Sequence, residues 1–186
     1  MDLFEAIAER RSVRKFADKP VPREVIEQLL SAAVQAPSAM NKQTWAFGVV
    51  QGGDKVKELG ERARLALLKE LEQKGGPADF RARLENPELA VLHGAQALIV
   101  VYATSEDRFA TINCCLAAEN LMLAATGMGL GTCWIGMAEA LLRSPEVKAE
   151  MGVPQEAQPI ATLILGYPDD DSPRKAKNPP TVLYWL

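Results

Sequence analysis

Apolar residues follow two patterns along this chain, one typical of helices and the other typical of strands. From residues 2, 22 and 54 onward they recur every three or four positions, which predicts three amphipathic helices. Short apolar runs at residues 45–50, 97–103 and 160–166 predict strands, and the last two are apolar enough to be buried on both faces.

Residues that favour helix ends mark the boundaries of these helices. Asp2 can cap the first helix, and Pro22 suits the first position of the second. Pro37 ends the second helix because it lacks an amide proton. After a turn at residues 52–53, Asp54 is the expected cap of the long third helix.

Residues 107–126 are almost all small and apolar, which predicts a helix that is covered on several sides. A subunit interface is favoured, and a central core helix is the alternative. Glycines at 127, 129 and 131 follow a helix rather than a strand, so they do not form a dinucleotide-binding loop. Beyond them, Ser144 and Pro145 predict a helix that stops and restarts.

Two stretches lack a clear pattern. Residues 74–86 are irregular, and they predict either a mobile lid or a simple loop. Residues 169–180 are polar and rich in proline, whereas residues 181–186 are strongly apolar. We expect this apolar end to dock, either on its own sheet edge or on a partner.

Composition narrows the class of protein. A chain of 186 residues with 48% hydrophobic content predicts a single compact domain. A net charge of −3 argues against general nucleic-acid binding, and no apolar run is long enough to cross a bilayer. Three cysteines and no secretory signal favour a reduced, cytoplasmic protein, and a single histidine makes a metal site improbable.

Residues 10–15 place four cationic side chains and a serine hydroxyl close together. Guanidinium groups match phosphate geometry, so this cluster could hold a phosphate monoester. The alternative is that Arg10 and Arg11 only complement the negative end of the first helix. The residues alone leave both interpretations open.

Residues 36–45 form a loop by composition, and Ser38, Asn41 and Gln43 bring polar side chains together in it. Two amides offer donors and acceptors that suit the edge of a heteroaromatic ring. Taken alone, the pattern favours ordinary turn chemistry, since serine and asparagine readily bond their own backbone.

Four segments together resemble the nitroreductase family of flavin mononucleotide (FMN) enzymes, in the same order and with similar spacing. They are residues 10–16 (RRSVRKF), 36–45 (APSAMNKQTW), 129–136 (GLGTCWIG) and 165–168 (LGYP), the last followed by Arg174 and Lys175. Thr44 stands where the family usually has proline. The resemblance covers nearly the whole chain and is weakest over residues 55–93.

This resemblance implies an α+β, three-layer fold, with a mostly antiparallel central sheet between helices and two subunits intertwined as a homodimer. It implies one FMN-binding domain over residues 1–186. The extension at about 169–186 would pack on the partner subunit. Two FMN sites would lie at the interface, each lined by both subunits.

The resemblance also assigns roles to residues. Arg10 and Ser12 would hold the phosphate and ribityl chain, and Arg14 would lie near the N1–C2 edge of the flavin. Residues 37–41 of the other subunit would line the ring, and residues 134–136 would pass its N5–O4 side. The candidate cofactor-binding residues are Arg10, Arg11, Ser12, Arg14, Pro37, Ser38, Ala39, Met40, Asn41, Gln43, Trp134, Ile135, Gly136, Arg174 and Lys175.

The implied activity is transfer of hydride from NADH or NADPH to flavin N5, and on to nitroaromatic, quinone or similar acceptors by a ping-pong mechanism. No side chain is expected to act as a catalytic acid or base, and His93 belongs to no motif. The alternatives are specialised flavin chemistry on the same scaffold (dehalogenation, flavin fragmentation or azoline oxidation) and an FMN-binding protein without turnover.

Overall fold

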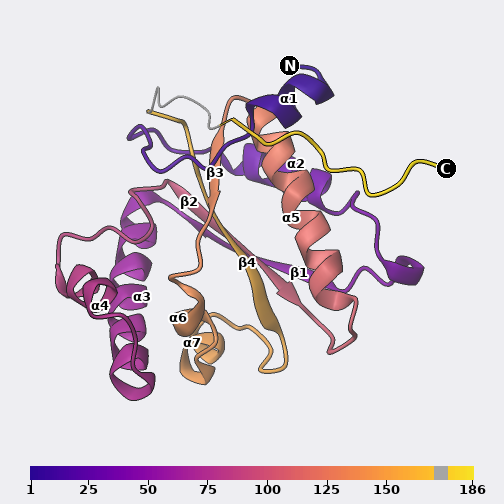
Figure 1. Ribbon diagram of the computed structural model, residues 1–186. Helices are drawn as coiled ribbons and strands as arrows, with labels where there is room; N and C mark the ends of the chain where they lie inside the picture. Colours follow the sequence, from indigo (N-terminus) through magenta and orange to yellow (C-terminus); the bar gives the residue numbers. More distant parts are fainter. Residues whose placement is uncertain (170–175) are drawn as a thin grey trace.

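The computed structural model describes residues 1–169 and 176–186. Within them, four strands form one antiparallel sheet in the order β1-β2-β4-β3 (Figure 1). The strands are β1 (Trp45–Gln51), β2 (Ala97–Ala103), β3 (Gly131–Trp134) and β4 (Gln158–Gly166). The three strands that the apolar runs predicted are confirmed, and β3 is an addition.

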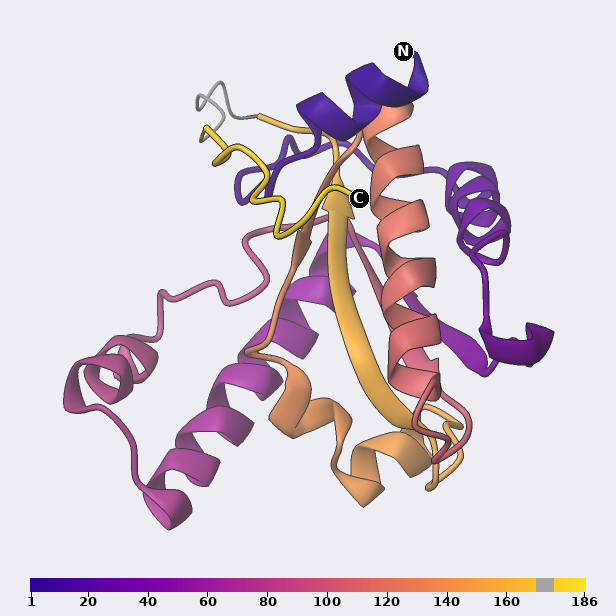
Figure 2. The ribbon, with the colours of Figure 1, turned by 45° about the vertical axis from the view of Figure 1, so that its right-hand side comes forward.

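Helices cover both faces of this sheet, which makes three layers (Figures 1 and 2). One layer contains α1 (Leu3–Glu9), α2 (Arg23–Ala33) and α5 (Ala110–Gly127). The other contains α3 (Gly53–Lys74), α4 (Ala78–Glu85), α6 (Glu139–Leu142) and α7 (Pro145–Glu150). A short 3-10 helix, η1 (Ala39–Asn41), lies between α2 and β1. The α+β three-layer prediction is confirmed.

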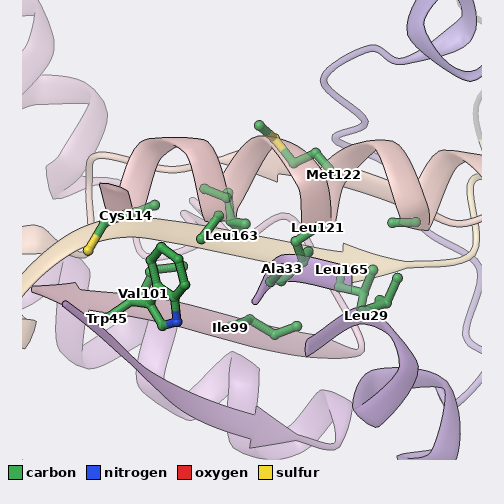
Figure 3. Close-up of a cluster of buried hydrophobic side chains, with 14 of the residues drawn as sticks. Leu29, Ala33, Trp45, Ile99, Val101, Cys114, Leu121, Met122, Leu163 and Leu165 are labelled. Atoms are coloured by element: carbon green, nitrogen blue, oxygen red, sulfur yellow. The ribbon is translucent and has the colours of Figure 1, made fainter. Parts of the chain in front are cut away.

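The central strands are apolar throughout because both of their faces are buried. Successive side chains of a strand point to opposite faces. Ile99 and Val101 therefore pack under α2 and α5, whereas Leu98 and Val100 pack toward α3. Figure 3 shows the first of these clusters, in which side chains from β1, β2 and β4 meet those of α2 and α5.

Three local predictions differ from the structure. Pro22 is the N-cap of α2 and not its first residue. Residues 74–86 are not an irregular loop, because they contain α4. Arg64 of α3 is buried and donates to the backbone carbonyl of Leu84, which holds α4 against α3. At the start of α3 the N-cap is Gly52, with φ at 109°, and Asp54 lies in the first turn instead of capping it.

Helix α5 is a core helix on one side. Eight of its residues are buried within this single chain, including Asn113, Cys114 and Leu121. The core alternative is thus confirmed for that side. Ile112 and Leu116, on its other side, stay exposed, so the interface interpretation remains a prediction for them.

Apolar side chains are exposed at both ends of the chain. Asp2 caps α1 as predicted, but Leu3, Phe4 and Ile7 of this helix are exposed, Phe4 to 81%. Leu183 and Trp185 in the terminal segment are about 90% exposed. Among the described residues, no helix is long and apolar enough to cross a membrane.

Candidate functional site

The basic stretch lies along the free edge of β3. Ser12 forms a parallel bridge with Thr132, and the Val13 amide donates to the Thr132 carbonyl at 2.9 Å. Val13 is buried over Gly131, where an added Cβ would lie 2.7 Å from a Val13 methyl carbon. In an extended segment the neighbours of an inward side chain point outward. Ser12 and Arg14 are accordingly exposed.

The segment at the end of β4 joins the same edge. The Ala17 amide donates to the Tyr167 carbonyl, and the Asp169 amide donates to the Lys15 carbonyl. Phe16 covers Gly166, where a Cβ would approach its ring to 2.8 Å. Three of the four motif segments therefore meet at one edge of the sheet. Arg174 and Lys175, predicted beside them, lie outside the described residues.

Residues 134–136 continue from β3 next to this edge. Trp134 is 40% exposed, and a Cβ at the exposed Gly136 would meet no atom within 4 Å. Ile135 differs, because its side chain is buried and its amide donates to the Thr162 carbonyl. The structure thus leaves Ile135 only its backbone carbonyl to offer to a ligand.

Acidic side chains accompany the cations of the basic stretch. Arg10 lies 3.5 Å from Glu119 of α5, measured from Nε to Oε1, and Lys15 lies 3.2 Å from Asp169. The Lys15 pair is largely exposed and the Arg10 pair is partly exposed, so water weakens both. A phosphate dianion could therefore compete with Glu119 for Arg10.

His93 is a neighbour of Arg14 that the sequence did not reveal. Burial is the main cause that lowers the pKa of His93, and the charges of Arg14 and Arg83 add to it. His93 also lines a cavity of about 550 Å³ between α3 and residues 87–94, together with Asp18 and Lys57. Its φ of 54° is the left-handed value that non-glycine residues rarely adopt.

The loop after Pro37 is held by its own polar groups. The Ser38 hydroxyl accepts from the Gln43 amide at 3.0 Å, and the Gln43 side chain donates to Asn41 Oδ1 at 3.2 Å. The turn chemistry that the residues favour when taken alone is therefore present, and the ring recognition that the resemblance implies stays a prediction. Met40, at the tip, is 89% exposed. Pro37, Ser38, Ala39, Met40, Asn41 and Gln43 thus lie together in one surface loop.

One chain does not bring this loop to the basic stretch. Helix η1 lies on the opposite side of α5 from the coil that follows α1, in both views of the ribbon (Figures 1 and 2). Residues 37–43 and residues 10–14 are therefore two separate surfaces of one subunit. A ligand that touches both must bind between two copies of the chain.

The fold and this cationic sheet edge define a class: a three-layer α+β protein with a surface suited to an anionic ligand. The model of the nitroreductase family matches residues 7–167, so the chain belongs to the nitroreductase family. The match includes residues 10–16, 129–136 and 165–167 of the converging segments, the loop after Pro37 and both central strands.

Individual proteins agree with this membership. A protein of Methanothermobacter thermautotrophicus, provisionally named an NADH dehydrogenase/NAD(P)H nitroreductase, is 30% identical over 92% of this chain and 80% of its own. A Bacteroides fragilis nitroreductase crystallised with bound FMN has a TM-score of 0.84, 30% identity, and coverage of 100% and 98%. Another from Desulfitobacterium hafniense, also with bound FMN, has a TM-score of 0.83, 25% identity and full coverage of both chains.

Proposed function

We propose that this protein is an FMN-dependent oxidoreductase that takes hydride from NADH or NADPH and passes it to nitroaromatic, quinone or similar acceptors. The observation that carries the proposal is the meeting of residues 10–16, 131–136 and 165–169 at one edge of the sheet. Two solved nitroreductase structures that hold FMN match this fold over the full length of the chain.

The residues at the edge fit FMN. Arg10 and Ser12 supply a guanidinium and a hydroxyl for a phosphate, and charge-assisted bonds of this type are the strong ones. The open side of Gly136 leaves room for a flat ring beside Trp134. In this proposal Arg174 and Lys175 complete the phosphate contacts.

The second half of the site comes from another copy of the chain. A homodimer would bring residues 37–43 of one subunit to the basic edge of the other, which one chain cannot do. Exposed apolar side chains on α1 and on the outer side of α5 support such an interface. The apolar end, residues 181–186, would pack on the partner as part of the C-terminal extension of a single domain, at about 169–186.

When bound, FMN would supply the chemistry of accepting and donating hydride. The chain's own groups hold and orient it. Arg14 places a fixed positive charge at the edge, which favours the oxidation state that carries more negative charge. Donor and acceptor would occupy the same slot in turn, a ping-pong sequence that requires no side-chain acid or base. The free thiols of all three cysteines fit a cytoplasmic location.

A visible spectrum of the purified full chain tests the cofactor. We expect a yellow protein that releases FMN, or a colourless one that takes up added FMN with co-elution on gel filtration. A protein that binds no FMN under either condition overturns the proposal.

Turnover is tested next. Oxidation of NADH or NADPH with a quinone or a nitroaromatic acceptor should proceed at steady state, with the two substrates giving parallel double-reciprocal lines. Bound FMN without turnover would instead identify a flavin-binding protein that does not carry out this reaction.

A matched pair of variants tests the phosphate site. Arg10→Ala should weaken FMN binding, because it removes a charge-assisted donor. Glu119→Gln removes the acidic partner of Arg10 and should leave binding equal or tighter. Equal losses in both variants would argue that the ion pair matters only for folding.

A further inference from the structure

One buried side chain ties together the two ends of the loop that follows Pro37. Asn113 of α5 is 2% exposed. Its Oδ1 accepts from the Ala39 amide at 3.1 Å, and its Nδ2 donates to the Thr44 hydroxyl at 2.9 Å. A backbone amide can only donate, so the Ala39 contact fixes which way the Asn113 amide points.

The loop between these two contacts has an unfavourable backbone. Met40, Asn41 and Gln43 have φ values of 54°, 54° and 50°. Residues other than glycine keep such values only where the surrounding contacts determine the conformation. The loop therefore depends on whatever holds its ends.

Apart from a long, partly buried contact of 3.7 Å from the Cys114 thiol to the Thr44 carbonyl, the other side-chain contacts of the loop lie nearer to solvent. The Lys42 ammonium pairs with Asp107 at 2.5 Å, and the Ser38–Gln43 bond is exposed. By contrast, both bonds of Asn113 are partly buried. Polar bonds away from water are costly to leave unmade. Asn113 is thus the interior attachment of the loop to the scaffold.

Thr44 is a well-fixed partner for Asn113. Its carbonyl accepts from the Thr104 amide at 3.2 Å, next to the start of β1. A proline at position 44 would fix φ by its ring. Threonine leaves φ free but offers the hydroxyl that Asn113 contacts. The hydrogen bond can therefore supply the restraint that the ring does not.

We propose that Asn113 is a positioning residue, which holds residues 39–44 in the conformation that faces the flavin ring of the partner subunit. The proposal rests on the proposed FMN function of the loop. Asn113 itself touches no ligand and acts through the loop backbone.

The principal test compares Asn113→Leu with Asn120→Leu. Asn120 is a partly buried asparagine on the same helix, and it donates to the Ala32 carbonyl at 3.3 Å, away from the loop. Both variants should lose thermal stability. Only Asn113→Leu should weaken FMN binding, alter the visible band of the bound flavin and reduce kcat/KM, by up to about a hundredfold.

A second pair keeps the proposal testable if Asn113→Leu folds poorly. Thr44→Val removes the hydroxyl at nearly constant volume, and Thr44→Ser retains it. We expect Thr44→Val to loosen FMN binding and Thr44→Ser to restore it. Equal FMN affinity in Thr44→Val and the unaltered protein would contradict the role of this bond.

Hydrogen exchange separates this inference from the proposed function. In the flavin-free protein, the amide of Ala39 should exchange faster in Asn113→Leu than in Asn120→Leu. If the unaltered chain binds no FMN, the proposed function fails, whatever the exchange shows. If it binds FMN and Asn113→Leu matches it in affinity, spectrum and Ala39 exchange, the positioning role is overturned.

Discussion

The two halves of the proposed site are built in different ways. The basic edge at residues 10–16 is held by backbone pairing with β3 and by side chains seated over glycines. The loop at residues 37–43 is held by side-chain hydrogen bonds and has left-handed φ values. Backbone pairing tolerates many side chains, whereas side-chain bonds depend on particular residues.

Because of this difference, we expect the two halves to contribute differently to ligand binding. The edge provides a fixed set of positive charges for an anionic group, and its geometry follows from the sheet. The loop is a separate, exposed element, and we expect its conformation to be sensitive to substitutions at the few residues that hold it. Changes at the edge should therefore affect both stability and binding, whereas changes in the loop should affect binding more selectively.

The largest effect on stability and FMN binding is expected where Val13 packs over Gly131. Gly131→Ala would place a Cβ 2.7 Å from a Val13 methyl carbon. Such overpacking costs about 1–3 kcal/mol, so thermal unfolding should shift downward and FMN binding should weaken. Gly136→Ala, which adds a Cβ in open space, should leave the unfolding temperature unchanged. Recovery of FMN binding in the Gly131→Ala, Val13→Ala double variant would show that the clash is the cause.

The next effect concerns charge at the edge. Arg14→Ala should lower FMN affinity and lower the reduction potential of the bound flavin, because a positive charge near the ring favours the reduced form. Arg14→Lys should retain much of the potential. Redox titration with a reference dye measures the reduction potential of the bound flavin in both variants. An unchanged potential in Arg14→Ala would exclude this role.

A smaller effect is expected at His93, the one histidine of the chain. Burial and the charge of Arg14 lower its pKa, so Arg14→Ala should raise that pKa without restoring its ordinary value, because burial remains. The imidazole resonance in a pH titration by NMR reports it directly. Arg83→Ala should produce a shift of the same sign, and a downward shift in either variant would contradict the assignment.

The lowered pKa of His93 also predicts how the stability of the fold depends on pH. A histidine whose pKa is lowered by folding stabilises the folded state above its unfolded pKa of about 6.5. That contribution is lost as pH falls from there toward the lowered folded pKa. His93→Gln should flatten this part of the stability profile, measured by denaturant unfolding between pH 7 and pH 5.

The smallest effect is expected in the loop's exposed ion pair. The hydrogen bond from Lys42 is the main cause that lowers the pKa of Asp107. The pair is therefore intact at neutral pH and is lost only as the pH falls through that lowered pKa. Asp107→Asn should change FMN binding far less than Asn113→Leu does. A comparable loss would place the main attachment of the loop at the surface.

Much of the fold followed from apolar patterning. The run at residues 97–103 gave β2 with its observed ends, because a strand buried on both faces is apolar throughout. Helix α4 escaped prediction because it buries one main side chain, Leu84, and depends on Arg64 from another helix. Such tertiary support leaves no local period in the sequence.

The site was predictable in composition but not in arrangement. The motifs indicated the basic stretch and the loop, yet only the structure shows that α5 lies between them. Asn113 gave a signal, as one of two asparagines in a helix of mostly small apolar residues. His93 gave none, because its nearness to Arg14 depends on the course of residues 87–94.

The glycines under Val13 and Phe16 impose an order of events on folding. Gly131 lies in β3 and Gly166 ends β4. The spaces over these two glycines, which Val13 and Phe16 fill, become neighbours only when the strands have paired. Until that point Val13 and Phe16 cannot both pack over these glycines, and the arginines of residues 10–14 are not yet held at the sheet edge. Capture of an anion should consequently appear late during refolding, and it can serve as a signal that the sheet is complete.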